Sequence, residues 1–187
     1  MDPFSDEALM ARIRQGDLEH AGLLFERHHG ALYSFFVHTT RQPAVSQDLA
    51  QDVFVRLLTY RTSYQLGARV RPWLHQIARN VLADHWKRPG NAAIPLDEAP
   101  PLPSSQSPAV ELERSELRAR LDGALARLNP DNRELLVLSH VSDLSYDEIA
   151  ETYGITVNAA RVRVCRALKA FRTLYTQHEA SDELPRR

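Results

Sequence analysis

Near the C-terminus, one stretch of a predicted helix carries positive charge and no negative charge. Its cations lie between Val157 and Thr173, and they are Arg161, Arg163, Arg166, Lys169 and Arg172. A solvated structural helix usually mixes both signs, whereas a phosphate backbone attracts only cations. The charge pattern therefore favours binding to a nucleic acid over a purely structural role.

The same helix divides into two faces when it is plotted at 100° per residue. Its predicted apolar face holds Val157, Ala160, Val164, Ala167, Leu168 and Phe171. On the rest of the surface, Asn and Arg can hydrogen-bond base edges, and Val and Ala can contact thymine methyl groups. We predict that duplex DNA is bound by Asn158, Ala159, Arg161, Val162, Arg163, Arg166 and Lys169.

A second basic concentration runs from Arg69 to Arg88 and is expected to lie on another helix. Its apolar face holds Leu74, Ile77, Ala78, Val81 and Leu82, with Trp73 at the edge. The predicted outer face shows His75, Gln76, Arg79, Asn80, Trp86 and Lys87. A tryptophan beside cations suits stacking on unpaired bases. The alternative, that Trp86 packs on the end of a neighbouring helix, stays open at this point.

An earlier predicted helix presents Asp48, Gln51 and Asp52 on its outer face, with Arg56 near the boundary. An acidic and amide surface of this kind suits a basic protein partner better than DNA. Most such patches merely keep a helix soluble, so both interpretations remain open.

The sequence offers no catalytic or metal-binding constellation. Its one cysteine, Cys165, has no CxxC partner, and its histidines form no HExxH motif. We find no nucleophile with an adjacent base, no paired acid and base, and no phosphate loop. We therefore predict a non-enzyme without cofactor or metal. No apolar run approaches the roughly 20 residues of a membrane span, and the acidic N-terminus lacks a signal-peptide core, so we predict a cytoplasmic protein.

Four helices are expected in the first half. Ser5 is a candidate cap for a helix ending at Gly16, and Asp17 for one reaching about His38. The second helix has an apolar stripe of Leu18, Ala21, Phe25, Leu32 and Phe36. The third spans about 46–60 and buries Leu49, Val53, Phe54 and Leu57. Pro72 suits the first position of the fourth, which ends near Arg88.

The second half of the chain is predicted to contain a helix over 110–128, another from Pro130 to about Val141, and a helix-turn-helix. Ser145 and Glu148 form a capping box, Gly154 supplies the turn, and Thr156 can cap the last helix. With no persuasive strand pattern, we predict an all-α protein. It comprises two small helical domains, 1–88 and 110–187, joined by a Pro-rich linker over 89–109.

Four segments together resemble the extracytoplasmic-function sigma factors of the sigma-70 family. They are residues 48–56 (DLAQDVFVR), residues 71–80 (RPWLHQIARN), residues 128–138 (LNPDNRELLVL) and the helix-turn-helix of residues 144–171. All four occur in the family's order. Pro72, Val70, Val162 and Ala159 depart from the commoner family residues, so no promoter sequence is transferred.

The resemblance implies a promoter-specific transcription initiation factor that binds core RNA polymerase and promoter DNA. An anti-sigma factor is a further expected partner. The polymerase surface would include Asp48, Gln51, Asp52 and Phe54. The minus-ten element would be engaged and melted by Arg71, His75, Arg79, Asn80, Trp86, Lys87 and Arg88, and the last helix would read the minus-thirty-five element. The alternative is a stand-alone helix-turn-helix regulator, which leaves the basic helix of the first half unexplained.

Overall fold

The computed structural model describes residues 2–88 and 108–182, and every regular element in these ranges is helical. The N-terminal half contains α1 (Asp6–Arg14), α2 (Ala21–Thr40), α3 (Pro43–Thr59) and α4 (Val70–Lys87). The C-terminal half contains α5 (Pro108–Arg127), α6 (Pro130–Leu136), α7 (Tyr146–Tyr153) and α8 (Val157–Asp182), with a π-helical turn over Val137–Val141. The predicted all-α fold with a C-terminal helix-turn-helix is confirmed.

Local signals explain most helix ends. The Ser5 hydroxyl accepts a hydrogen bond from the Ala8 amide (3.2 Å), so Ser5 caps α1 as predicted. Asn129 caps α6 in the same way through the Asn132 amide (2.8 Å). The predicted linker lies outside the described residues except for its last two, which begin α5. The domain boundaries themselves stay a prediction.

The predicted stripe on the second helix was wrong in its first turns. Residues Leu18–His20 form a 3-10 turn, and α2 begins only at Ala21. Leu18 therefore lies outside α2 and is 47% exposed, whereas Phe25 lies on the same face of α2 as the buried Leu32 and Phe36 and is still 38% exposed. The buried residues of α2 include Leu32 and Phe36, as predicted, together with Leu24, Phe35 and Val37.

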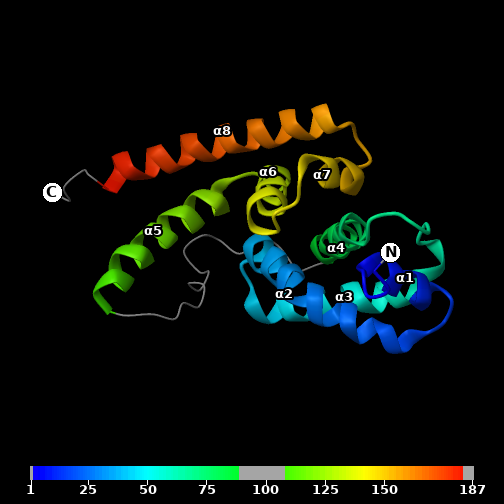
Figure 1. The fold of residues 1–187 in the computed structure, drawn as a ribbon. Coiled ribbons are helices and arrows are strands. Elements are labelled where there is room, and N and C mark those ends of the chain that lie inside the picture. Colours follow the sequence, from blue (N-terminus) through cyan, green and yellow to red (C-terminus); the bar gives the residue numbers. More distant parts are fainter. Residues whose placement is uncertain (1, 89–107, 183–187) are drawn as a thin grey trace.

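The two halves pack against each other. In Figure 1, α6 and α7 lie between the long α8 and the N-terminal helices. Helix α4 contacts α7, while α2 contacts α6 and the π-helical turn. The buried apolar residues of both halves join one continuous cluster, which includes Phe36 and Leu74 from the first half and Leu138 and Ile149 from the second. The basic helix α4 is therefore covered in part by the C-terminal half.

Candidate nucleic-acid and polymerase interfaces

The helix-turn-helix is held by three local devices that the sequence predicted. Ser145 and Glu148 form a complete capping box at the start of α7. Gly154 ends α7 with φ +63°, a left-handed conformation that glycine adopts without a steric penalty. The Thr156 hydroxyl then accepts a hydrogen bond from the Ala159 amide (3.2 Å) at the start of α8. All three interactions lie at the ends of α7 or at the first turn of α8. Local contacts therefore determine how α8 is oriented relative to α7.

The outward face of α8 matches the predicted duplex-binding face. Ala160, Val164 and Ala167 are buried, whereas Asn158 and all five predicted cations of the stretch are exposed. Val162 is 40% exposed and Ala159 is half-buried. Among the residues whose side chains the structure describes, none forms a hydrogen bond or ion pair with the side chains of Arg163, Arg166 and Lys169. Arg161 lies over the Tyr146 ring at 5.6 Å from its centroid. This face is thus free to meet an anion.

The predicted outer face of α4 is split between solvent and the C-terminal half. Asn80, Lys87 and Arg88 are exposed, as predicted. Arg71 and Arg79 are half-buried because α7 and α6 lie against them. Trp86 is half-buried and packs against the apolar cluster, with its ring 4.9 Å from that of His85. The structure thus supports the packed interpretation of Trp86, although its ring is still partly open to solvent.

His75 lies inside the protein and not on the outer face where the helical plot placed it. It is only 2% exposed, its Nδ1 donates to the Arg71 carbonyl (2.9 Å), and its Nε2 has no hydrogen-bond partner among the described residues. The plot could not detect this because the covering residues come from distant parts of the chain. Burial lowers the pKa of His75 to about 4, since a proton on Nε2 would create a buried, unsolvated charge.

We expect His75 to make stability depend on pH in the mildly acidic range. The unfolded chain binds a proton at this side chain near pH 6.5, whereas the folded chain does so only near pH 4. Stability from this group is therefore present above pH 6.5 and lost as the pH falls toward 4, by up to about 3 kcal/mol. Urea unfolding of the parent and of His75→Phe at pH 7, 5.5 and 4.5 measures it. Equal pH slopes for the two proteins would contradict the burial of a neutral imidazole.

The residues predicted to contact the polymerase lie on α3, and only some of them are exposed and without an ion pair among the described residues. Asp48 and Gln51 are exposed, whereas Asp52 pairs with Arg56 (3.3 Å), which also pairs with Asp84 of α4 (2.8 Å). This pairing lowers the pKa of the Asp84 carboxyl. Phe54 is 9% exposed and lies 4.8 Å from the Phe25 ring, which agrees with the buried face predicted from periodicity. Its role in a polymerase surface stays a prediction.

Sequence reasoning missed two exposed apolar side chains near these faces. Val55, 60% exposed, lies on α3 on the same side as Asp48 and Gln51, because residues three, four and seven apart share a helix face. Tyr60, 55% exposed, helps to line a hollow of about 300 Å³ together with Asn80 and Lys87. The sequence signal for Val55 was an apolar residue in the middle of a polar helix surface. No sequence signal pointed to Tyr60, because the hollow forms between the end of α3 and α4, which are separate segments of the chain.

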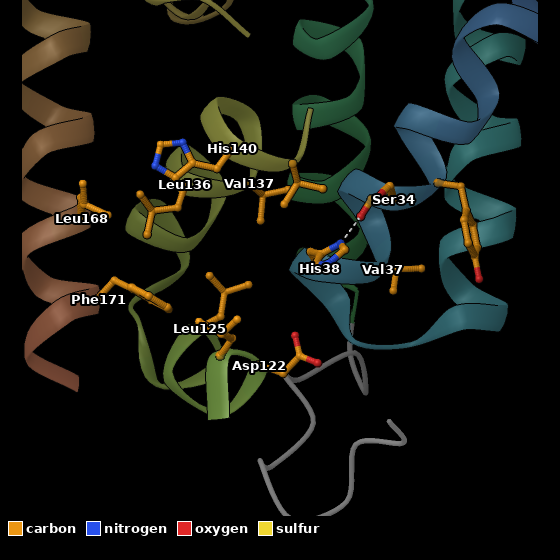
Figure 2. A pocket seen from close by; sticks show the side chains of 13 residues that line it. Ser34, Val37, His38, Asp122, Leu125, Leu136, Val137, His140, Leu168 and Phe171 are labelled. Carbon is orange, nitrogen blue, oxygen red and sulfur yellow. Dashed lines mark hydrogen bonds between the residues drawn. The ribbon is translucent and has the colours of Figure 1, made fainter. Parts of the chain in front are cut away.

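A larger cavity, of about 590 Å³, lies between the halves. Figure 2 shows its apolar lining, to which α2 contributes Val37, α5 contributes Leu125, and α8 contributes Leu168 and Phe171. His38 also lines it, and its Nδ1 donates to the Ser34 carbonyl (2.8 Å). Apolar side chains form most of the lining, although Ser34, Asp122 and His140 also contribute to it, so the cavity suits an apolar segment better than a charged ligand.

The comparisons with known proteins match both halves. Sigma-70 region 2 matches residues 24–91, and Sigma-70 region 4 matches residues 118–171. The RNA polymerase sigma factor CarQ of Myxococcus xanthus is 35% identical over 91% of this chain and 97% of its own length. The chain belongs to the extracytoplasmic-function sigma factors of the sigma-70 family. As a sigma factor, it directs promoter-specific initiation of transcription, and the stand-alone regulator is not favoured.

Other relatives and solved structures agree with this sigma factor's family and fold. The extracytoplasmic-function sigma factor SigM of Bacillus subtilis is 28% identical over 82% of this chain and 94% of its own length. The structure of CnrH with the cytosolic domain of CnrY has a TM-score of 0.69 at 24% identity, covering 92% of this chain and 97% of that one. RpoE of Bartonella quintana, in complex with the anti-sigma factor NepR, has a TM-score of 0.66 at 22% identity, covering 83% and 96%.

Two features are absent from the described residues. No group of three or more His, Cys, Asp or Glu side chains there could hold a metal ion. No helix in the same ranges is long and apolar enough to cross a membrane.

Proposed function

We propose that this sigma factor divides promoter recognition between its two basic helices. Helix α8 reads the duplex of the minus-thirty-five element, and the exposed part of α4 engages the opened minus-ten strand. The observation that carries this division is the difference between the two surfaces. Helix α8 offers exposed cations, an amide and small apolar groups, which suit a major groove. The α4 surface offers a hollow beside an exposed aromatic ring, which suits unpaired bases.

Within α8, we assign base reading to Arg166 and Asn158 and phosphate binding to Arg161, Arg163 and Arg172. Arg166 and Asn158 lie on the side of α8 opposite the buried Val164 and Ala167. When α8 docks into a groove, these two side chains therefore point toward the bases. The flanking cations reach the backbone on either side. Phosphate contacts position a protein on DNA, and base contacts select the sequence.

Beside α4, the hollow lined by Tyr60, Asn80 and Lys87 is the proposed place for an unpaired base. Tyr60 supplies a ring for stacking and Asn80 an amide for a base edge. Lys87, which lies 3.5 Å from Asp84 in the same hollow, supplies a cation for phosphate. Arg88 and the partly open ring of Trp86 extend this surface toward the end of α4. In this structure, contacts inside the protein hold Arg71, Arg79 and His75. These three side chains can bind DNA only if the two halves separate, and otherwise their role is structural.

Core polymerase is the proposed partner of the α3 surface made of Asp48, Gln51, Asp52 and Val55. This surface combines carboxylates with a solvent-exposed apolar side chain in one helix face. Such a combination suits a basic protein surface with an apolar centre. The protein then acts where the polymerase acts, in the cytoplasm, and has no catalysis, metal or cofactor of its own.

We expect Asp48→Lys combined with Gln51→Lys to weaken binding to core polymerase by about tenfold or more. Like charges placed against a basic partner repel, and electrostatic mismatch at an interface costs several kcal/mol at most. The fold should persist, because exposed substitutions usually change stability by less than about 0.5 kcal/mol. Binding is measured by fluorescence anisotropy of labelled protein with core polymerase. The control is Glu26→Lys, a charge reversal at an exposed acidic position on α2. If the folded double variant binds core polymerase as tightly as the parent, this surface is only solvated and does not bind the polymerase.

An anti-sigma factor is the proposed second protein partner, as the family resemblance implies. The apolar cavity between α2, α5 and α8 is its candidate contact, since both halves line it and an apolar helix face would fill it. Hydrogen exchange of this sigma factor with its cognate anti-sigma factor tests the location. We expect slower exchange in α2 around Val37 and in α8 around Leu168, and unchanged exchange there would exclude this contact.

A further inference from the structure

Helix α1 carries two adjacent carboxylates that contact different parts of the N-terminal half. Asp6 pairs with Arg27 and His28 of α2, both at 2.7 Å. Glu7 instead accepts a hydrogen bond from the Val70 amide at the start of α4 (3.3 Å). The inner side of α1 is apolar and buried. Helix α1 is therefore anchored to α2 and reaches the first turn of α4.

The contact from Glu7 supplies a cap that α4 lacks in its own sequence. Within the described residues, the side chain of Arg69, which precedes α4, caps no amide of the first turn. Free amides at the start of a helix need an acceptor, and a carboxylate there also interacts favourably with the helix dipole. Glu7 provides both from a position 63 residues earlier in the chain. The sequence of α4 alone therefore does not determine how its first turn is held.

Helix α1 also contacts the loop of residues 60–69, which joins α3 to α4. Arg14 donates through Nε to the Thr62 carbonyl (3.4 Å) near the start of this loop. The Ser63 hydroxyl donates to the carbonyl of Tyr60 (2.7 Å), whose ring lines the hollow beside α4. Because α1 is a single regular helix, its contacts hold the start of the loop and the residue after its end at a defined separation.

The loop itself folds around a buried tyrosine. Tyr64 is 1% exposed, its hydroxyl donates to the Ala68 carbonyl, and its ring centroid lies 5.1 Å from that of Trp73 on α4. Burial raises the pKa of Tyr64 to about 12, with further contributions from the nearby carboxylates of Glu7 and Asp6. The hydroxyl therefore keeps its proton and remains a donor. Contacts within the protein thus order the loop before any strand binds.

We propose that Glu7 is a positioning residue for binding of the opened minus-ten strand. It holds the end of the loop that begins at Tyr60, and it thereby helps to set where the Tyr60 ring lies relative to Asn80 across the hollow. Glu7 is not among the described residues that line the hollow, so it acts through the loop and not on the nucleic acid. A site that is ordered in advance loses less conformational freedom on binding. This inference rests on the proposed role of the hollow in binding an unpaired base.

The test measures promoter opening by the holoenzyme with Glu7→Ala and with Glu7→Gln, as permanganate reactivity of unpaired thymines. Glutamine keeps a side-chain oxygen that can accept from the Val70 amide, whereas alanine removes the acceptor. The control is Glu19→Ala, which removes one carboxylate at an exposed position in the 3-10 turn before α2. Fluorescence anisotropy with core polymerase and thermal unfolding distinguish a positioning effect from loss of the fold.

We expect Glu7→Ala to open the promoter about fivefold less than the parent, which is the ratio that loss of an ordinary capping interaction gives. Glu7→Gln should restore most of the opening, Glu19→Ala should resemble the parent, and core binding should be unchanged in all three. Opening by Glu7→Ala at the parent's level overturns the proposal. An equal defect in Glu7→Gln also overturns it, because the acceptor oxygen is then not what matters. Weaker core binding by Glu7→Ala does so too, because Glu7 then supports the whole domain.

Combining Glu7→Ala with Tyr60→Ala separates this inference from the proposed function. If Glu7 acts through Tyr60, the combined variant should open the promoter no less than Tyr60→Ala alone, because the effects of coupled residues are not additive. Additive defects overturn the positioning role and leave the proposed role of Tyr60 intact. Normal opening by Tyr60→Ala, together with a defect in Glu7→Ala, contradicts the proposed function and shows that Glu7 acts by another route.

Discussion

Replacing Tyr60 and Asn80 by alanine is expected to reduce promoter opening by the holoenzyme roughly tenfold or more, while closed-complex formation persists. Both side chains line the hollow beside α4, and neither takes part in the ion pairs between the halves. Stacking of a base on an aromatic ring contributes about 1–3 kcal/mol. Melting costs a few kcal/mol per unstacked base, so loss of the stacking platform shifts the balance back to duplex.

The measurement is permanganate reactivity of unpaired thymines in a defined promoter. Tyr60→Phe is the matched control, because it keeps the ring and removes only the hydroxyl, and it should open the promoter like the parent. A pre-melted bubble should restore part of the lost transcription by the double variant, since the melting cost is then already met. If the folded double variant opens the promoter like the parent, the role of this surface is structural and it does not bind the opened strand.

Replacing Arg166 by alanine is expected to relax base preference at one position of the minus-thirty-five element. Arg166 is exposed on α8, opposite the buried side, and pairs with no described side chain. A bidentate contact from arginine to guanine discriminates against other bases by about 1–3 kcal/mol. Losing it should therefore flatten selection at one base pair and leave the others unchanged.

Arg172→Ala is the comparison for this result, because Arg172 is also exposed on α8 but lies on its flank. Its loss should weaken all sequences alike and reduce the salt dependence of binding by about one counterion. Selection from a randomised promoter library with the holoenzyme measures both variants. An Arg166→Ala protein with the parent's sequence preference would show that this side chain only holds phosphate.

The parts of the structure that sequence predicted well are those determined by near neighbours. The capping box at Ser145, the turn at Gly154 and the outward face of α8 all depend on residues within a few positions of one another. The C-terminal half leaves that face of α8 uncovered, so periodicity alone predicted its exposure.

The errors arose where distant segments decide the outcome. His75 was predicted on the outer face of its helix, yet it is buried, and its ring lies 6.1 Å from that of Phe35 on α2. Leu18 was misplaced because it lies in the 3-10 turn Leu18–His20, which precedes the start of α2. The pairing of Arg79 with Glu134 joins residues 55 positions apart, and the sequence showed the charges without showing which of them meet.

The division of labour between α8 and α4 is tested most directly by cleaving DNA from each helix in the same holoenzyme. Cys165 is the chain's one cysteine and is exposed on α8, so an iron chelate attached there reports the DNA nearest that helix. A second protein, Cys165→Ser with Lys87→Cys, carries the chelate beside the α4 hollow. We expect cleavage of duplex DNA in the minus-thirty-five element from Cys165. From position 87 we expect cleavage in the minus-ten element that becomes strong only after promoter opening. Cleavage of one common region by both probes, or equal cleavage from position 87 before and after opening, would contradict the division.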